Sequence, residues 1–322
     1  MLRGMKFLLT GLVLAGLTIA ANSEDYPSKP IRLLVPYSPG GTTDVLGRIL
    51  GQKFKENWGE QAIVDNRPGG YETIAADIVA KSSPDGYTIG LFLSPYAVNP
   101  FVLKKMPYDT VKDFAPVTLV VIVPGVMVMN PAVNAKTLQE IVALAKAKPG
   151  SLNYASPGPL TSGHLSMELL KSMAGIDIVH IPYKGSAPAM TDLIAGQIQL
   201  VITGPASTLA NIAAGRVKPV ATTGAQRSKS LPDIPTIAES GFPGYETYEW
   251  YGIFAPARTP SALVEKLQQE VSRILQSPDM QKRMQALYLD PIGNTPAQFS
   301  QFLRDEMRKM GTLVKKIGMQ AD

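Results

Sequence analysis

The chain has 322 residues, of which 31 are basic and 26 acidic, giving a net charge of +5, and it contains no cysteine. The missing thiols exclude disulfides, thiolate metal sites and a cysteine nucleophile. The basic residues are scattered, with pairs such as Lys104-Lys105 as their longest runs, whereas a nucleic-acid-binding protein usually gathers them on one face. We therefore expect no nucleic-acid partner, and a mild positive field that attracts small anions.

Residues 1–23 have the features of a signal peptide. Met1–Lys6 is a basic start, Phe7–Leu17 is an apolar core, and small residues follow, so cleavage is expected between Ala20 and Ser23. The alternative, a transmembrane anchor, needs about 20 apolar residues, and this run is shorter. No cysteine follows the apolar core, which argues against a lipid-anchored protein. We predict an exported chain that needs no redox chemistry.

The first half of the mature chain alternates strands and helices, which is typical of an α/β fold with a mostly parallel sheet and helices on both faces. With about 300 residues, the mature chain is long enough for two such domains. Short apolar runs predict strands at 31–35, 62–66, 88–93, 115–123 and 125–129, and helical periodicity predicts helices at 45–57, 74–82 and 137–147.

The same alternation continues through the second half. Strands are expected at 153–155, 179–183, 199–203, 217–222 and, as the last one, 250–255. Helices are expected after the loop 156–164, with Leu165, Leu169, Leu170 and Met173 on one face, then at 187–195, 207–214, 261–276, 278–287 and 296–317, and a short helix opens at 234–236. No linker is rich enough in Gly or Ser to separate two independent domains. We therefore predict two domains that exchange strands through two crossovers, with a cleft between them.

The segment Pro39–Asp44 joins the first predicted strand to the first predicted helix. Its two glycines allow the backbone to turn sharply and to approach a ligand, and Thr42, Thr43 or Asp44 can cap the helix. The first helical turn presents unpaired N–H groups and the positive end of the helix dipole. The sequence therefore predicts an anion-binding cradle at this turn.

A similar arrangement recurs at residues 156–164. Ser156, Thr161 and Ser162 are short hydroxyl donors suited to a carboxylate, and they are equally good helix caps. A third strand–turn–helix unit follows, with Lys184-Gly185-Ser186 as its turn. In the simpler interpretation these loops are caps and turns only. Three such loops in one chain, together with the family resemblance given below, favour binding.

Catalytic signals are sparse. The sequence has two histidines, His164 and His180, and it has no G-x-S-x-G, G-x-G-x-x-G, P-loop or H-E-x-x-H motif. His164 lies at a helix start close to Ser162, which favours hydrogen bonding or ligand contact, and His180 lies in an apolar strand, which favours a structural role. We predict no catalytic residue, no metal site and no cofactor. A hydrolase is kept as the weaker alternative.

Short motifs along the whole mature chain resemble one protein family. They are Tyr26-Pro27-Ser28-Lys29-Pro30-Ile31-Arg32, Pro39-Gly40-Gly41-Thr42-Thr43-Asp44, Asn66-Arg67-Pro68-Gly69, Pro84-Asp85-Gly86-Tyr87-Thr88, Pro107-Tyr108-Asp109, Leu152-Asn153-Tyr154-Ala155-Ser156, His180-Ile181-Pro182-Tyr183-Lys184-Gly185 and Leu231-Pro232-Asp233-Ile234-Pro235-Thr236. In this order they resemble the substrate-binding proteins of tripartite tricarboxylate transporters, the Bug (TctC-like) family.

This resemblance implies a periplasmic binding protein of type II, with two doubly wound α/β domains that close on a ligand like a Venus flytrap. The implied domains are 24–122 with 248–322, and 123–247. The implied function is the capture of a small carboxylate in the periplasm and its delivery to membrane permease subunits, by a protein that is a monomer. A periplasmic ligand-sensing subunit of a two-component receptor is the alternative, because fold and pocket would be the same.

The resemblance also implies where the ligand lies. Pro39–Asp44 would grip one carboxylate with backbone amides and ordered waters, and Ser156–His164 and the strand end at Thr203-Gly204 would meet its other end. The predicted ligand-binding residues are Tyr37, Pro39, Gly40, Gly41, Thr42, Thr43, Asp44, Ser94, Tyr96, Ser156, Pro157, Gly158, Thr161, Ser162, His164, Tyr183, Thr203 and Gly204.

Departures from the family pattern bear on the ligand. Gly70-Tyr71-Glu72-Thr73 replaces a glycine-rich stretch. If this turn borders the cleft, Tyr71 would narrow the cleft and Glu72 would repel an anion. In the alternative, both side chains point into solvent. Thr203 stands where many relatives have Asp, which argues against an amino acid ligand. Ser94 and Tyr96 would add a hydroxyl and an aromatic wall. We expect a dicarboxylate, with aromatic dicarboxylates among the candidates.

Overall fold

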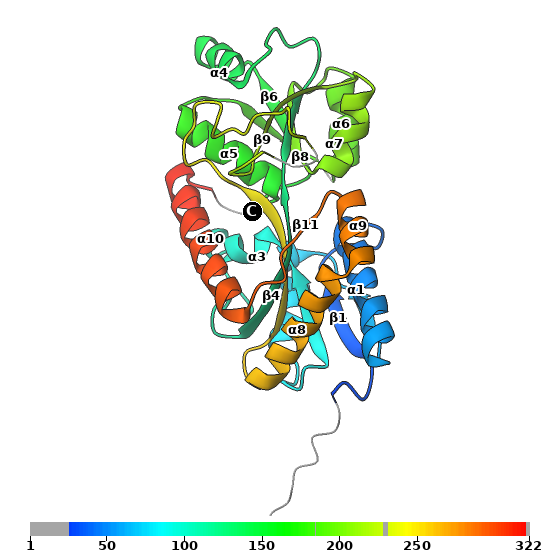
Figure 1. Ribbon diagram of the computed structural model, residues 1–322. Coiled ribbons are helices and arrows are strands. Elements are labelled where there is room, and N and C mark those ends of the chain that lie inside the picture. The colour runs from blue at the N-terminus through cyan, green and yellow to red at the C-terminus, as the bar shows by residue number, and fades with distance from the viewer. Residues whose placement is uncertain (1–25, 184, 228–230, 320–322) are drawn as a thin grey trace, which may run out of the picture.

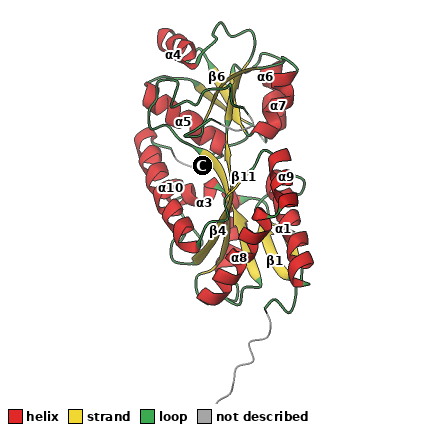
Figure 2. Ribbon diagram, in the orientation of Figure 1, coloured by secondary structure: helices red, strands yellow, loops and turns green. Residues whose placement is uncertain are grey.

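The computed structural model describes residues 26–183, 185–227 and 231–319, so the predicted signal peptide lies outside the described residues. The described chain is elongated and has two sheets, one above the other in Figure 1. Each sheet, with helices on its faces, forms one lobe (Figure 2), and the C-terminal helix also packs through Met310 and Leu313 against Leu165 of the other lobe. No helix within the described ranges is both long enough and apolar enough to span a bilayer.

The first lobe contains a six-stranded sheet in the order β11-β4-β10-β3-β1-β2. Its strands are β1 (Ile31–Val35), β2 (Ala62–Asn66), β3 (Thr88–Phe92), β4 (Phe114–Pro124), β10 (Tyr248–Pro256) and β11 (Asp290–Pro291). Its helices are α1 (Thr42–Trp58), the 3-10 turn η1 (Gly70–Glu72), α2 (Thr73–Ala80), α3 (Ser94–Val102), α8 (Ser261–Gln276), α9 (Pro278–Ala286) and α10 (Pro296–Ile317).

The second lobe contains a five-stranded sheet in the order β7-β6-β8-β5-β9. Its strands are β5 (Val126–Met129), β6 (Asn153–Ser156), β7 (Val179–Pro182), β8 (Leu200–Thr203) and β9 (Lys218–Thr222). Its helices are α4 (Leu138–Ala147), α5 (Ser162–Ala174), α6 (Ser186–Ile194) and α7 (Pro205–Ala213).

Both sheets are mixed, whereas the sequence predicted mostly parallel pairing. β1 pairs in parallel with β2 and β3, and β6 with β7 and β8. The strands that lead into or out of the crossings run the other way: β10 is antiparallel to β3 and β4, and β5 is antiparallel to β8 and β9. The prediction was wrong on this point because strand direction depends on the two crossings between lobes, which local periodicity does not show.

The chain crosses between the sheets at two adjacent points. β4 leads through Gly125 into β5, and the chain returns after β9 to enter β10. Pro124 and Tyr248, which flank the crossings, are partners in the β4–β10 register. A Cβ atom at Gly125 would come within 3.0 Å of Ile202, so the narrow crossing favours glycine.

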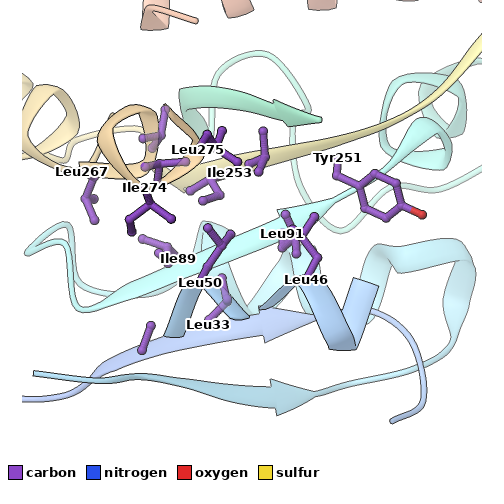
Figure 3. Packing of buried hydrophobic residues seen from close by; sticks show 14 of the residues in the cluster. Leu33, Leu46, Leu50, Ile89, Leu91, Tyr251, Ile253, Leu267, Ile274 and Leu275 are labelled. Carbon is purple, nitrogen blue, oxygen red and sulfur yellow. The ribbon is translucent and has the colours of Figure 1, made fainter. Parts of the chain in front are cut away.

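A continuous apolar core fixes the start of α1. Residues Leu46 and Leu50 of α1 pack with Leu33 of β1, and α8 covers the same face of the sheet (Figure 3). In α8, the side chains of Leu267 and Ile274 are fully buried at helical spacing. The other face of the sheet is covered by α2, α3 and α10. Because both faces are packed, the loops at the ends of β1 and β3 are held in fixed positions.

Three local predictions differ from the structure. Helix α3 was not predicted because prolines occupy positions 95 and 100, yet Pro95 falls in the first turn, where its missing N–H costs nothing. The two-residue strand β11 was also missed, because it is too short for a periodic signal. The helix expected at 234–236 is absent from this described segment: Thr236 forms a β-bridge with Thr222 instead.

Candidate ligand-binding cleft

A cleft of about 420 Å³ lies between the lobes and is lined by residues of both. The first lobe contributes Tyr37, Gly41, Thr42, Thr43, Leu93, Ser94, Pro95, Glu249 and Tyr251, and the second contributes Pro157, Thr161, Ser162, Gly185, Ser186 and Thr203. Its volume lies within the range of small-molecule sites. Four helix starts border it, those of α1, α3, α5 and α6, each entered from the carboxyl end of a strand.

The loop before α1 is held from behind by Asp44. The Asp44 carboxylate accepts hydrogen bonds from the Gly40 N–H at 3.0 Å, from Asn66 at 3.1 Å and from Arg48 at 2.9 Å. The Arg48 hydrogen bonds, with those from Gly40 and Asn66, lower the pKa of Asp44 to about 2. Asp44 is therefore an ionised anchor for the loop.

The first turn of α1 is open toward the cleft. The helix begins after Gly41, which is extended (φ −80°, ψ 171°), and no described side chain caps it, contrary to the predicted cap by Thr42, Thr43 or Asp44. The first helical hydrogen bond runs from the Val45 N–H to the Gly41 carbonyl. The N–H groups of Thr42 and Thr43, in the first turn of α1, have no partner within the helix and are therefore available to a ligand at the positive end of the helix dipole.

The loop before α5 is braced by a stacked pair of histidines. The rings of His164 and His180 lie 4.0 Å apart and nearly parallel. The Leu160 N–H donates to Nδ1 of His164 at 3.1 Å, and Nε2 of His180 lies 2.7 Å from the Ser156 hydroxyl. Burial lowers the pKa of His164 to about 3 and also lowers that of His180. Both rings are therefore neutral at physiological pH and serve as a support for residues 157–162.

The contact between Ser156 and His180 is the nearest approach to a catalytic pair in this loop. Ser156 is fully buried and its hydroxyl also bonds with the Gly158 carbonyl at 2.9 Å. A nucleophile must reach a substrate carbonyl, and neither Ser156 nor His180 lines the cleft. This geometry supports the loop and offers no access for a substrate. No cluster of three potential metal ligands occurs among the described residues.

At the start of α6, Ser186 and Thr203 of β8 face each other at the cleft wall. Their hydroxyl oxygens are 2.9 Å apart. Gly185, just before α6, has φ +119°, a conformation open to glycine. Tyr183 turns away from the cleft: its hydroxyl donates to Asp192 of α6, and this hydrogen bond raises the pKa of Tyr183 to about 12.

Two glutamates in unusual surroundings lie on the first-lobe side. Glu249 of β10 lines the cleft and accepts a hydrogen bond from the Tyr251 hydroxyl at 2.7 Å. Glu72 is buried behind the cleft, where it accepts from the Tyr37 hydroxyl at 2.9 Å and the Leu93 N–H at 3.1 Å. Burial raises the pKa of Glu72 to about 8 and also raises that of Glu249.

The backbone around Glu72 is strained. Tyr71 and Glu72 have φ of +53° and +76°, values that non-glycine residues rarely adopt. From the sequence, Glu72 was expected either beside the cleft or in solvent. Neither position is correct, because its carboxyl is buried between Tyr37 and the start of α3. Tyr71 does not line the cleft either and is 36 % exposed. This strained turn therefore holds the carboxyl of Glu72 directly behind Tyr37, which lines the cleft.

The structure brings half of the predicted ligand-binding residues to the cleft. Those that line it are Tyr37, Gly41, Thr42, Thr43, Ser94, Pro157, Thr161, Ser162 and Thr203. Those that do not line it are Pro39, Gly40, Asp44, Tyr96, Ser156, Gly158, His164, Tyr183 and Gly204. Tyr96 is buried, with its hydroxyl donating to the Thr110 carbonyl at 2.6 Å, so the aromatic walls come from Tyr37 and Tyr251 instead.

Six lining residues were not predicted: Leu93, Pro95, Gly185, Ser186, Glu249 and Tyr251. Glu249 had one available signal, because it precedes the apolar run 250–255 and shares the alternation of Tyr251, which places both side chains on one face of a strand.

The fold and the cleft define the class of protein. Two α/β lobes joined by two adjacent crossings around a cleft are the type II fold of periplasmic binding proteins. Comparison with known proteins agrees with this. Residues 46–319 match the family described as "Tripartite tricarboxylate transporter family receptor". The chain therefore belongs to this receptor family, as the motifs predicted.

Individual relatives span nearly the whole chain. BugT of Bordetella pertussis is 34 % identical over 94 % of each chain. Among solved structures, R. palustris Rpa4515 with adipate has a TM-score of 0.82 at 34 % identity, covering 92 % of this chain and 99 % of that one. MatC (Rpa3494) from Rhodopseudomonas palustris with bound malate has a TM-score of 0.78 at 28 % identity, covering 90 % of this chain and all of the other.

Proposed function

We propose that this protein is a periplasmic solute-binding protein that captures a small dicarboxylate between its lobes and passes it to the membrane subunits of a tripartite transporter. One observation carries the proposal: the cleft is lined from both lobes by hydroxyl groups and by helix N-termini. The export follows from the predicted signal peptide. The lobes are proposed to consist of residues 24–122 with 248–322, and of 123–247.

The chemistry of the lining suits an anion with two charged ends. Among the described residues of the cleft none is Lys, Arg or His, so the donors are backbone N–H groups and the hydroxyls of residues such as Thr42, Ser162 and Ser186. Such donors at helix starts bind carboxylates well. The α1 start and the α5 start belong to opposite lobes, and a carboxylate bound at each would join them.

Relatives give independent support. The structures of Rpa4515 with adipate and MatC with malate are solved with four- to six-carbon dicarboxylates, and this chain shares their fold. A ligand that contacts both lobes stabilises the closed arrangement over an open one by the difference in its affinity for the two. The neighbouring crossings at Gly125 and Tyr248 are where we place the motion.

A thermal-shift screen tests this proposal. The mature protein, residues 24–322, is melted with mono- and dicarboxylates, aromatic ones included, and with sugars and divalent cations as controls. A ligand that binds only the folded state raises the melting temperature, by an amount that grows with ligand concentration. We expect at least one dicarboxylate to do so. A shift with sugars or cations and with no carboxylate would overturn the proposal.

A further inference from the structure

The cleft of an anion-binding protein contains a carboxyl group of its own. Glu249 lines the main cleft and also the small adjoining space beside Gly125 and Thr223, so it stands where the two lobes meet. Its carboxyl is anchored on one side by the Tyr251 hydroxyl at 2.7 Å. Glu249 lies opposite Val123 in the β10–β4 pairing, so its backbone is held on a central strand of the sheet.

The groups around Glu249 leave an ionised form poorly compensated. On its own strand Tyr251 donates one hydrogen bond. From the loop after β1, Tyr37 faces it, with the acid Glu72 behind, and the two glutamates repel one another. From the second lobe the neighbours are uncharged side chains such as Ser162 and Thr203. None of the described residues that line either space is a cation.

We propose that Glu249 is the specificity-determining residue of the cleft, and that it meets the ligand as a neutral carboxylic acid whose O–H donates to a carboxylate oxygen of the ligand. This inference rests on the proposed function. Where free Glu249 is ionised, binding takes one proton from solvent onto its carboxylate, and the O–H so formed makes the hydrogen bond. A protonated acid can act as such a donor. Burial raises the pKa of Glu249, which agrees with this assignment.

The inference makes ligand capture depend on pH in a defined direction. If only the protonated form binds, affinity is constant below the pKa of free Glu249 and falls about tenfold per pH unit above it. In the opposite assignment, an ionised Glu249 accepts a hydrogen bond from an amino or hydroxyl group of the ligand, and affinity rises with pH. Above about pH 6.5 the carboxyls of adipate and malate are themselves ionised, and the lowered pKa values keep both histidines neutral.

Isothermal titration with adipate and with malate separates these assignments. The mature protein is titrated from about pH 6.5 to about pH 9 in pairs of buffers with different ionisation enthalpies, which gives the number of protons taken up. We expect uptake to approach about one proton per ligand, with affinity falling as pH rises. Glu249→Gln keeps an N–H donor but cannot ionise, so its affinity should be independent of pH. Glu306→Gln, a buried acid of α10 outside the cleft, is the matched control and should behave like wild type.

Several results would overturn the inference. The first is binding by the wild type without proton uptake, and the second is an affinity that rises with pH. The third is a pH dependence of affinity that persists in Glu249→Gln and disappears in Glu72→Gln, because that result would assign the proton to Glu72. The proton uptake measured on the wild-type protein tests the inference even if a variant fails to fold. If neither adipate nor malate binds and no carboxylate raises the melting temperature in the thermal screen, the proposed function is overturned, and the inference with it. If a dicarboxylate binds without proton uptake, the inference alone is overturned.

Discussion

The Asp44 carboxylate lies behind the first cleft loop and accepts the Gly40 N–H at 3.0 Å. This contact, with those to Arg48 and Asn66, ties three segments together: the loop, the first turns of α1 and the end of β2. An acid in the middle of a predicted anion cradle would repel the ligand if it faced the cleft. The structure resolves that conflict because Asp44 is almost fully buried and points away.

Asp44→Asn should destabilise the protein at neutral pH by about 1 kcal/mol. The folded-state pKa of Asp44 is lowered to about 2, whereas the unfolded value is about 3.9. The stabilisation is therefore fully present above about pH 4 and is lost as pH falls toward 2. Chemical denaturation at pH 7 and at pH 3 should show the difference between variant and wild type shrinking with acidity. Asp305→Asn, in an exposed ion pair with Arg308, is the control and should change little.

Ser162→Ala should weaken dicarboxylate binding by about 0.5–1.5 kcal/mol and leave stability unchanged. The Ser162 hydroxyl lines the cleft and has no hydrogen-bond partner within the described part of the chain. Thr161→Ala should lose both affinity and stability, because the Thr161 hydroxyl also donates to the Gly158 carbonyl at 2.7 Å. Titration calorimetry and thermal melts of both variants check this, with Ser172→Ala on the same helix as control. Unaltered affinity in Ser162→Ala would remove it from the site.

Thr203→Asp should lower dicarboxylate affinity by about tenfold or more, since it places a carboxylate in the cleft lining that repels the carboxylates of the ligand. Thr203→Ser keeps the hydroxyl that lies 2.9 Å from Ser186 and should bind nearly as wild type does. The same variants titrated with an amino dicarboxylate should show a smaller loss, because an ammonium group offsets the new charge. An equal loss for both ligands would indicate a steric effect instead.

His164→Gln should flatten the dependence of stability on acid pH. The pKa of His164 is lowered to about 3 in the folded protein by burial first and by His180 second, and it is about 6.5 when unfolded. A base with a lowered folded pKa contributes fully above pH 6.5, and the contribution falls by about 2 kcal/mol by pH 5. Gln keeps an acceptor for the Leu160 N–H but does not titrate. Urea denaturation from pH 5 to pH 7.5 measures both slopes, and parallel slopes would contradict the assignment.

Local sequence was sufficient for most of the elements and for the first cleft loop. The apolar run 31–35 and the amphipathic helix behind Gly41 are set by near neighbours, so the helix start they form could be predicted. The same holds for α5, which was predicted to follow the loop 156–164 and begins within it, at Ser162. What local sequence did not show was the direction in which polar groups of these loops point. Asp44, Ser156 and His164 are polar residues next to the ligand loops, and all three brace the loops from behind.

The residues missed by sequence reasoning belong to distant segments. Glu249 and Tyr251 reach the cleft because β10 returns after the whole second lobe and pairs with β3 and β4. That pairing joins segments that are far apart in the sequence, so the residues around position 249 do not show which strands β10 will pair with. Tyr96 shows the converse: it lies two residues after Ser94, in a helix that was not predicted, and is buried against Phe254, with ring centroids 4.4 Å apart.

The most direct test of the account is calorimetric titration of the mature protein with adipate and malate, repeated on Ser186→Trp. Ser186 lies on the cleft wall, and an indole there would fill space that a small dicarboxylate needs. We predict saturable binding of at least one dicarboxylate with one site per chain, and its loss in Ser186→Trp while the variant still melts in a single cooperative transition. Binding that survives undiminished in the folded variant would place the ligand elsewhere and contradict capture between the lobes.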